Sequence, residues 1–131
     1  MFTLCKENCY EIGVNNSTGQ FQWAIFSNAQ GWAWLGSSAN ITNTWVHGVV
    51  TRDSNSLEKS YINGVLQSTV QRTSAPIKKV YNRINIGGRG GGTSPSSNFG
   101  GKIPIVRVYN KALSSDEILQ NFNVQKGRFG L

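Results

Sequence analysis

The residues of this sequence best suited to chemistry are aromatic and polar side chains of the kind that hold a sugar. A pyranose is recognised by an aromatic ring against its apolar face and by planar polar groups at its hydroxyls. Trp32 and Trp34 lie in a short glycine-flanked segment beside polar loops, and Arg89 and Asn98 flank a glycine-rich stretch. These four residues are the candidate carbohydrate-binding residues, with burial of either tryptophan in the core as the alternative.

The acidic residues and the single histidine do not form a catalytic set. Glycoside hydrolases hold two carboxylates across the scissile bond, and no strand of this sequence carries such a pair. Glu58 flanks a strand and is expected to be solvated. His47 follows Trp45 in an apolar strand, where a packed side chain is expected instead of the base of a serine or cysteine nucleophile. We therefore predict that the protein is not an enzyme, with glycoside hydrolysis as a less favoured alternative.

Two cysteines, Cys5 and Cys9, are separated by three residues. In one continuous strand they would be about 13 Å apart, too far for a disulfide, whereas across a three-residue hairpin they can meet. A disulfide and two free thiols therefore remain as alternatives for this pair. A zinc site is not expected, because Cys-x3-Cys with only a distant histidine does not supply four ligands.

Composition sets the class of protein and of partner. A chain of 131 residues with 38% hydrophobic and 15% charged residues is typical of one globular domain. Its net charge of +7 comes from scattered residues, with only Lys78 and Lys79 adjacent among the lysines. We therefore expect no nucleic-acid partner but a solvated cationic surface that either aids solubility or attracts acidic glycans. No apolar run is long enough for a membrane span, so no membrane insertion is expected.

Alternating apolar residues predict short antiparallel strands separated by polar turns. The predicted strands cover residues 10–14, 20–26, 32–35, 45–52, 80–86 and 102–109, together with a hairpin over 58–70. Asn63-Gly64 supplies the two positive-φ positions of a type I′ turn in that hairpin. Ser114 and Glu117 predict a capping box at the start of a short helix. The fold class is therefore all-β: a two-sheet antiparallel sandwich with one short C-terminal helix.

Several segments resemble laminin-G-like, concanavalin A-like jelly-roll domains. They are the strand, exit and helix start over residues 101–119, Thr44 to Asp53, the hairpin Tyr61 to Val65, and Ile84 to Gly88. The resemblance spans residues 10–124 and implies a jelly roll with Trp45 in its core. Trp23, on an alternating strand face, is also expected to be buried.

The same resemblance implies a binding rim and a metal candidate. Related domains hold Ca²⁺ in rim loops with Asp and Asn oxygens, which makes Asp53 and Asn55 a weak candidate calcium site, with no cofactor favoured. We expect the loop 87–97, with Arg89, Asn98 and the Asp53 loop, to line any binding site.

One departure from the family pattern concerns the N-terminus. Domains of this type begin with about three strands before the segment that corresponds to Leu4. We therefore expect residues 1–131 to be a single, N-terminally truncated domain, or a sandwich completed in another way. An uncovered edge favours a homodimer or higher oligomer, closed by the strand around residues 2–5 or by the tail 126–131.

Together these observations predict a non-catalytic, lectin-like module. It would bind a glycan, a glycoprotein surface or a protein partner through its rim loops. The alternative is a structural, adhesion or assembly domain of a viral or phage surface protein without a small ligand. An extracellular or virion-surface location is favoured, although residues 1–131 contain no signal segment.

Overall fold

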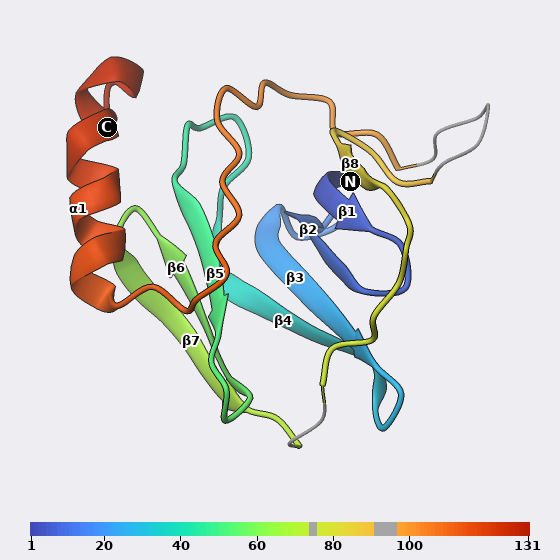
Figure 1. Ribbon diagram of the computed structural model, residues 1–131. Helices are drawn as coiled ribbons and strands as arrows, with labels where there is room; N and C mark the ends of the chain where they lie inside the picture. The colour runs from blue at the N-terminus through green and yellow to red at the C-terminus, as the bar shows by residue number, and fades with distance from the viewer. Residues whose placement is uncertain (74–75, 91–96) are drawn as a thin grey trace.

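Eight strands in the described part of the chain form two facing antiparallel sheets, with one helix beside them (Figure 1). This computed structural model describes residues 1–73, 76–90 and 97–131. The five-stranded sheet has the order β4-β3-β2-β1-β8, with β1 (Phe2–Lys6), β2 (Tyr10–Val14), β3 (Gln20–Ser27), β4 (Gly31–Asn40) and β8 (Ile84–Ile86). The three-stranded sheet has the order β5-β6-β7, with β5 (Gly48–Arg52), β6 (Leu57–Ile62) and β7 (Val65–Gln71). Helix α1 (Ser115–Lys126) and a 3-10 turn (Gly127–Phe129) end the chain. The predicted all-β sandwich with a C-terminal helix is confirmed.

Alternation along the strands separates the two faces of the five-stranded sheet. Its inner face buries apolar side chains: Leu4, Val14, Phe21, Trp23 and Ile25. Successive residues of a strand point to opposite faces, so this row leaves the intervening residues for the outer face. The burial of Trp23, which is 3% exposed, is as predicted.

A buried carboxylate joins the three-stranded sheet to the other layer. Glu58 on β6 is fully buried and pairs with both Arg52 and Arg72. Arg72 also donates from Nη2 to the carbonyl oxygen of Trp34 on β4, at 2.9 Å. The expectation that Glu58 is solvated is therefore wrong, because two guanidinium groups supply the charge that permits its burial.

Helix α1 packs on the outer face of the three-stranded sheet. The predicted capping box is present: the Glu117 amide donates to Ser114 Oγ, and the Ser114 amide donates to Glu117 Oε2. Ile118 is fully buried against Tyr61 and Leu113. The helix therefore adds a second small core on the face of the sheet that points away from the sandwich interior.

The hairpin turn between β6 and β7 has the backbone that its sequence predicts. Asn63 has φ of 53° and Gly64 has φ of 81°, the positive values that a type I′ turn requires. A Cβ added at Gly64 would lie 2.8 Å from Cδ1 of Leu119 on α1. The turn therefore lies directly beneath the helix.

Four predicted strands differ from the structure. The predicted strand 32–35 is longer and forms β4, Gly31–Asn40. Residues 102–109 belong to no strand, although their sequence alternates, because no neighbouring strand pairs with them. The predicted strand 45–52 begins at Gly48, and the predicted strand 80–86 is reduced to β8. Trp45, expected in the core, is 38% exposed, and its ring packs on Phe129 with 5.2 Å between centroids.

The two segments proposed to close an open edge by exchange have other roles. β1 lies inside the five-stranded sheet, paired with β2 on one side and β8 on the other, so it is not free to leave. The tail carries Phe129, which covers Trp45 within the same chain. Residues 91–96 of the predicted loop 87–97 lie outside the described residues.

Replacing Glu58 with Gln tests the link between the sheets. Glu58→Gln leaves two largely buried guanidinium groups without their carboxylate, and we expect the free energy of unfolding to fall by about 3 kcal/mol. Urea denaturation measures the loss. Lys111→Gln, which removes one partner of the exposed Lys111–Glu117 pair, is the control and should change stability far less. Equal effects of the two substitutions would contradict a structural role for Glu58.

A second substitution tests the hairpin turn. Gly64→Val places a β-branched side chain at positive φ, which we expect to lower the unfolding free energy by about 1 kcal/mol or more. Val65→Thr, at a neighbouring exposed position, should have little effect. An unchanged urea midpoint for Gly64→Val would show that the turn tolerates another backbone conformation.

Candidate functional site

Three aromatic rings form a strip on the outer face of the five-stranded sheet. Trp32 stands opposite Phe26 in the β3–β4 register, and Trp34 follows two residues later on the same face. The ring centroids of Phe26 and Trp32 are 5.4 Å apart in an edge-on arrangement, and those of Trp32 and Trp34 are 6.4 Å apart with planes at 26°. Trp34 is 45% exposed. The strip therefore presents an indole ring to solvent, with a second indole beside it.

Arg89 lies over this strip and is held by two carboxylates. Its Nε is 3.1 Å from Glu7 Oε1 and 3.1 Å from Glu11 Oε1. Its guanidinium carbon is 6.0 Å from the centroid of the Trp32 ring. Glu11, on β2, is only 1% exposed, so the loop that carries Arg89 is anchored to the sheet by a buried ion pair. Trp32, Trp34 and Arg89, distant in sequence, are thus brought together.

Asn98 adds an exposed amide next to Gly88, the residue before Arg89. The Phe99 amide donates to the Gly87 carbonyl oxygen at 2.9 Å, which joins the two ends of the loop. A Cβ added at Gly88 would lie 2.7 Å from Asn98 Oδ1, so the side chain of Asn98 rests on the glycine that precedes Arg89. Trp32, Trp34 and Arg89 are therefore together on the outer side of the five-stranded sheet, and Asn98 lies on the loop that carries Arg89.

The buried thiol of Cys5 lies next to the Glu11 carboxylate. Cys5 Sγ donates to Glu11 Oε1 at 3.6 Å. Burial, together with the nearby negative charge of Glu11, raises the pKa of Cys5 to about 12. Burial also raises the pKa of Glu11, which the positive charge of Arg89 partly offsets. Cys5 is consequently a protonated thiol at neutral pH, without the reactivity of a catalytic cysteine.

Sequence reasoning missed the cluster of Cys5, Glu7 and Glu11, whose potential ligand atoms lie within 4.8 Å of one another. The available signal was the hairpin turn that begins at Glu7, because it places Cys5 directly opposite Glu11. The cation in this cluster is the guanidinium of Arg89. The cluster is therefore explained by an ion pair and does not require a metal.

The candidate calcium residues form a turn. Asp53 Oδ1 accepts hydrogen bonds from the amides of Asn55 and Leu57, both at 2.9 Å. One carboxylate already used by two amides does not fit the six to eight oxygen ligands that Ca²⁺ takes. This turn joins β5 to β6, whereas the Arg89 loop follows β8 at a distant corner of the other sheet (Figure 1). The structure therefore does not bring Asp53 to the Arg89 rim.

His47 is packed, as expected, in a different part of the molecule. Its ring stacks on Phe122 of α1 with 6.1 Å between centroids. Burial lowers the pKa of His47, and the positive charge of Arg107 lowers it further. The imidazole is therefore neutral at pH 7. It contacts helix α1 and therefore lies in a different part of the fold from Glu7 and Glu11.

Comparisons with known proteins match this architecture. A laminin-G-like family model, described as the concanavalin A-like lectin/glucanases superfamily, matches residues 2–119. A crystal structure of an S-layer domain-containing protein from Clostridium thermocellum superposes with a TM-score of 0.50 at 26% identity. That match covers 89% of this chain and 58% of the other, so the chain spans little more than half of that structure. No curated protein matches the sequence.

Thiol chemistry tests the burial of this site. Cys5 and Cys9 are both free and buried, and burial raises the pKa of each. In guanidinium chloride we expect iodoacetamide to alkylate both cysteines. In the native protein at pH 8, Cys5 and Cys9 should react more than about a hundredfold more slowly than the exposed thiol of the control variant Ser54→Cys. Mass spectrometry of the modified peptides measures the rates. Rapid native modification of Cys5 would contradict the buried Glu11 cluster.

Proposed function

Because this chain belongs to the concanavalin A-like lectin/glucanases superfamily, we propose that it is a non-catalytic, lectin-like module. Its ligand is a carbohydrate, and its binding surface is the aromatic strip of Phe26, Trp32 and Trp34 with Arg89 and Asn98. The observation that carries this proposal is the exposed Trp34 ring, stacked beside Trp32 at the edge of a charged loop.

The chemistry of the strip suits a sugar ring. An exposed indole offers a flat apolar surface for the C–H face of a pyranose. The Arg89 guanidinium beside the strip supplies donors for hydroxyl groups, and the Asn98 amide on the same loop supplies a donor and an acceptor. Arg89 is already fixed by Glu7 and Glu11, so little side-chain entropy is lost when a ligand binds.

Charge favours an acidic glycan over a neutral one. The chain carries a net charge of +7, and Lys78 Nζ lies 5.1 Å from the Phe26 ring at one end of the strip. A carboxylated or sulfated chain would gain from this field, and its affinity would fall as salt is added.

The carboxylates near the strip do not suit hydrolysis. A glycosidase needs one carboxylic acid and one carboxylate that both reach the scissile bond. Glu11 is 1% exposed and both Glu7 and Glu11 bind Arg89, so the pair is occupied by an arginine instead of a substrate. This supports binding without catalysis.

The setting that we propose is a cell or particle surface. The similar solved structure is an S-layer domain-containing protein, and no helix in the described residues is long and apolar enough to cross a membrane. The second candidate function, an assembly or adhesion domain, is favoured by the exposed apolar side chains of residues 105–109. Self-association into a homodimer or higher oligomer belongs to this second candidate.

Binding to a glycan array, followed by titration of the best ligand, tests the lectin proposal. We expect Trp34→Ala to weaken binding by about tenfold or more, because a stacked aromatic ring contributes of the order of 1–2 kcal/mol. Tyr109→Ala removes an exposed aromatic ring away from the strip and is the matched control. If no glycan binds, or both variants bind like the parent, the proposal is wrong and the assembly function is favoured.

A further inference from the structure

Residues 102–109 have the sequence of a strand but pair with no strand in the described part of the chain. No hydrogen bond in the described part of the chain joins their backbone to another backbone. Their apolar side chains are also exposed: Ile105, Val106, Val108 and Tyr109. Unpaired backbone groups beside exposed apolar side chains form an edge that readily accepts another strand.

The facing strand, β5, has a free edge of its own. The Asn63 amide donates to the His47 carbonyl, and the Asp53 amide donates to the Leu57 carbonyl. In an antiparallel ladder the bonded pairs alternate, and the β5–β6 register therefore directs the odd-numbered residues of β5 to β6. Gly48 and Val50 consequently direct their amides and carbonyls away from β6, to the open edge.

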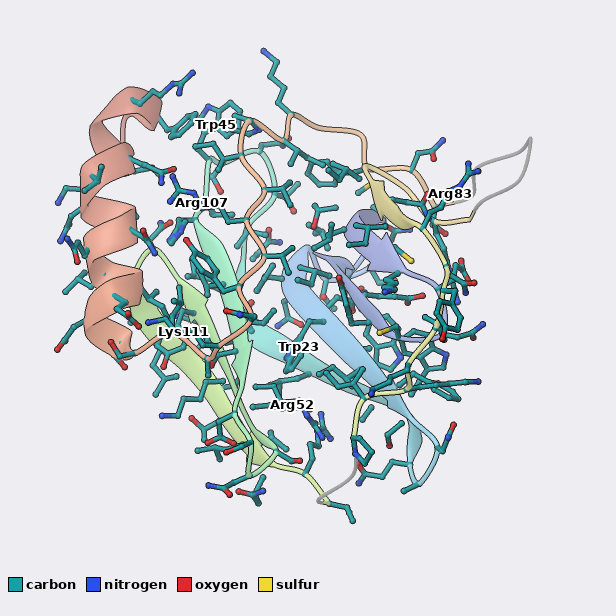
Figure 2. The ribbon with its side chains drawn as sticks, viewed as in Figure 1. Trp23, Trp45, Arg52, Arg83, Arg107 and Lys111 are labelled. Atoms are coloured by element: carbon teal, nitrogen blue, oxygen red, sulfur yellow. The ribbon has the colours of Figure 1, made fainter. Side chains whose placement is uncertain are left out.

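A cavity of about 1210 Å³ opens between the two layers and extends past β5 and residues 102–109 to helix α1. Val50 of β5 and Ile103 and Ile105 of the unpaired segment line it, together with the inner face of the five-stranded sheet. Trp23, which Figure 2 shows between the sheets, also lines the cavity, and its buried Nε1 has no hydrogen-bond partner among the described residues. Folded interiors rarely hold voids much larger than a water molecule. This cavity is far larger than that, and it is large enough to hold an additional segment of chain.

The charged side chains that line the cavity in the described residues are all basic. Within the described residues, its wall includes lysine and arginine side chains but no aspartate or glutamate: Arg52, Lys102, Arg107, Lys111 and Lys126. Arg52 and Lys111 have carboxylate partners, whereas Arg107 donates to the neutral amide of Asn121 at 3.4 Å. The cavity therefore attracts a negatively charged occupant.

We propose that this cavity accepts an extended, acidic segment of a partner polypeptide, which adds as a β-strand between β5 and residues 102–109. The backbone of the added segment forms hydrogen bonds with the open edge of β5 and with residues 102–109. Every second side chain of the segment is apolar and points to the inner face that carries Trp23. Acidic residues at its ends meet Lys102 and Arg107. A second copy is a poorer occupant, because each copy carries +7 and β1 and the tail are already in use.

A synthetic peptide of about ten residues, with alternating valine and threonine and aspartates at both ends, tests this directly. We expect saturable binding, detected by tryptophan fluorescence. Hydrogen exchange should show new protection of the amides of residues 102–109 and of Val50. The same peptide with lysines in place of the aspartates should bind at least about tenfold more weakly at low salt. No binding, or binding without protection of these amides, overturns the proposal.

Two proline variants separate strand addition from other binding. Val50→Pro removes an amide on the open edge without removing a β5–β6 bond, and should weaken peptide binding by about tenfold. Thr69→Pro is the matched control on the far edge of the same sheet, since Thr69 pairs with Lys59 in a non-bonded position. Equal binding of both variants overturns the proposal. Light scattering that shows a peptide-free dimer with residues 102–109 already protected also overturns it, in favour of a second copy.

Discussion

The Glu58 carboxylate is the interaction on which the arrangement of the two layers depends. It neutralises Arg52 within its own sheet and Arg72 at the end of β7, and Arg72 reaches across to the backbone of β4. A guanidinium group buried between sheets is tolerated only with such a partner. The aromatic strip rests on the opposite face of β4, so the same network that holds the layers together also supports the surface proposed to bind sugar.

The molecule thus separates two kinds of surface on its two layers. The outer face of the five-stranded sheet is rigid, because a buried ion pair fixes Arg89 against Trp32. The edge of the three-stranded sheet is incomplete: in the described part of the chain, β5 pairs only with β6, and residues 102–109 pair with no strand. Rigid polar surfaces suit selective recognition of a small ligand, whereas an open edge suits the addition of a strand.

Local signals were sufficient for much of the fold. The Asn63-Gly64 turn and the Ser114–Glu117 capping box depend on a few adjacent residues, and both are confirmed. Residues 102–109 show the limit of such reasoning, because alternation indicates a strand but pairing requires a neighbour elsewhere in the fold. Sequence alone also could not place Glu58, whose burial depends on two arginines, one of them 14 residues away.

The candidate site was predictable as a set of residue types but not as an arrangement. Trp32 and Trp34 were recognisable as ring candidates from their spacing, and their shared face follows from the β3–β4 register. The carboxylates that hold Arg89 were not recognisable, because the Arg89–Glu7 contact spans 82 residues. The calcium prediction did not help to locate the site, since the Asp53 carboxylate accepts hydrogen bonds from the backbone of its own turn.

The position of β1 has a consequence for how the chain is made. β1 leaves the ribosome before the other strands described here, yet one of its two neighbours, β8, is about 80 residues later in sequence, which at typical elongation rates is roughly 4 to 16 s of synthesis. Through that interval the β1–β4 meander carries an unpaired edge at β1. The nascent protein is therefore most vulnerable to aggregation before residue 84 emerges, and chaperone contacts on the ribosome should concentrate on that early meander.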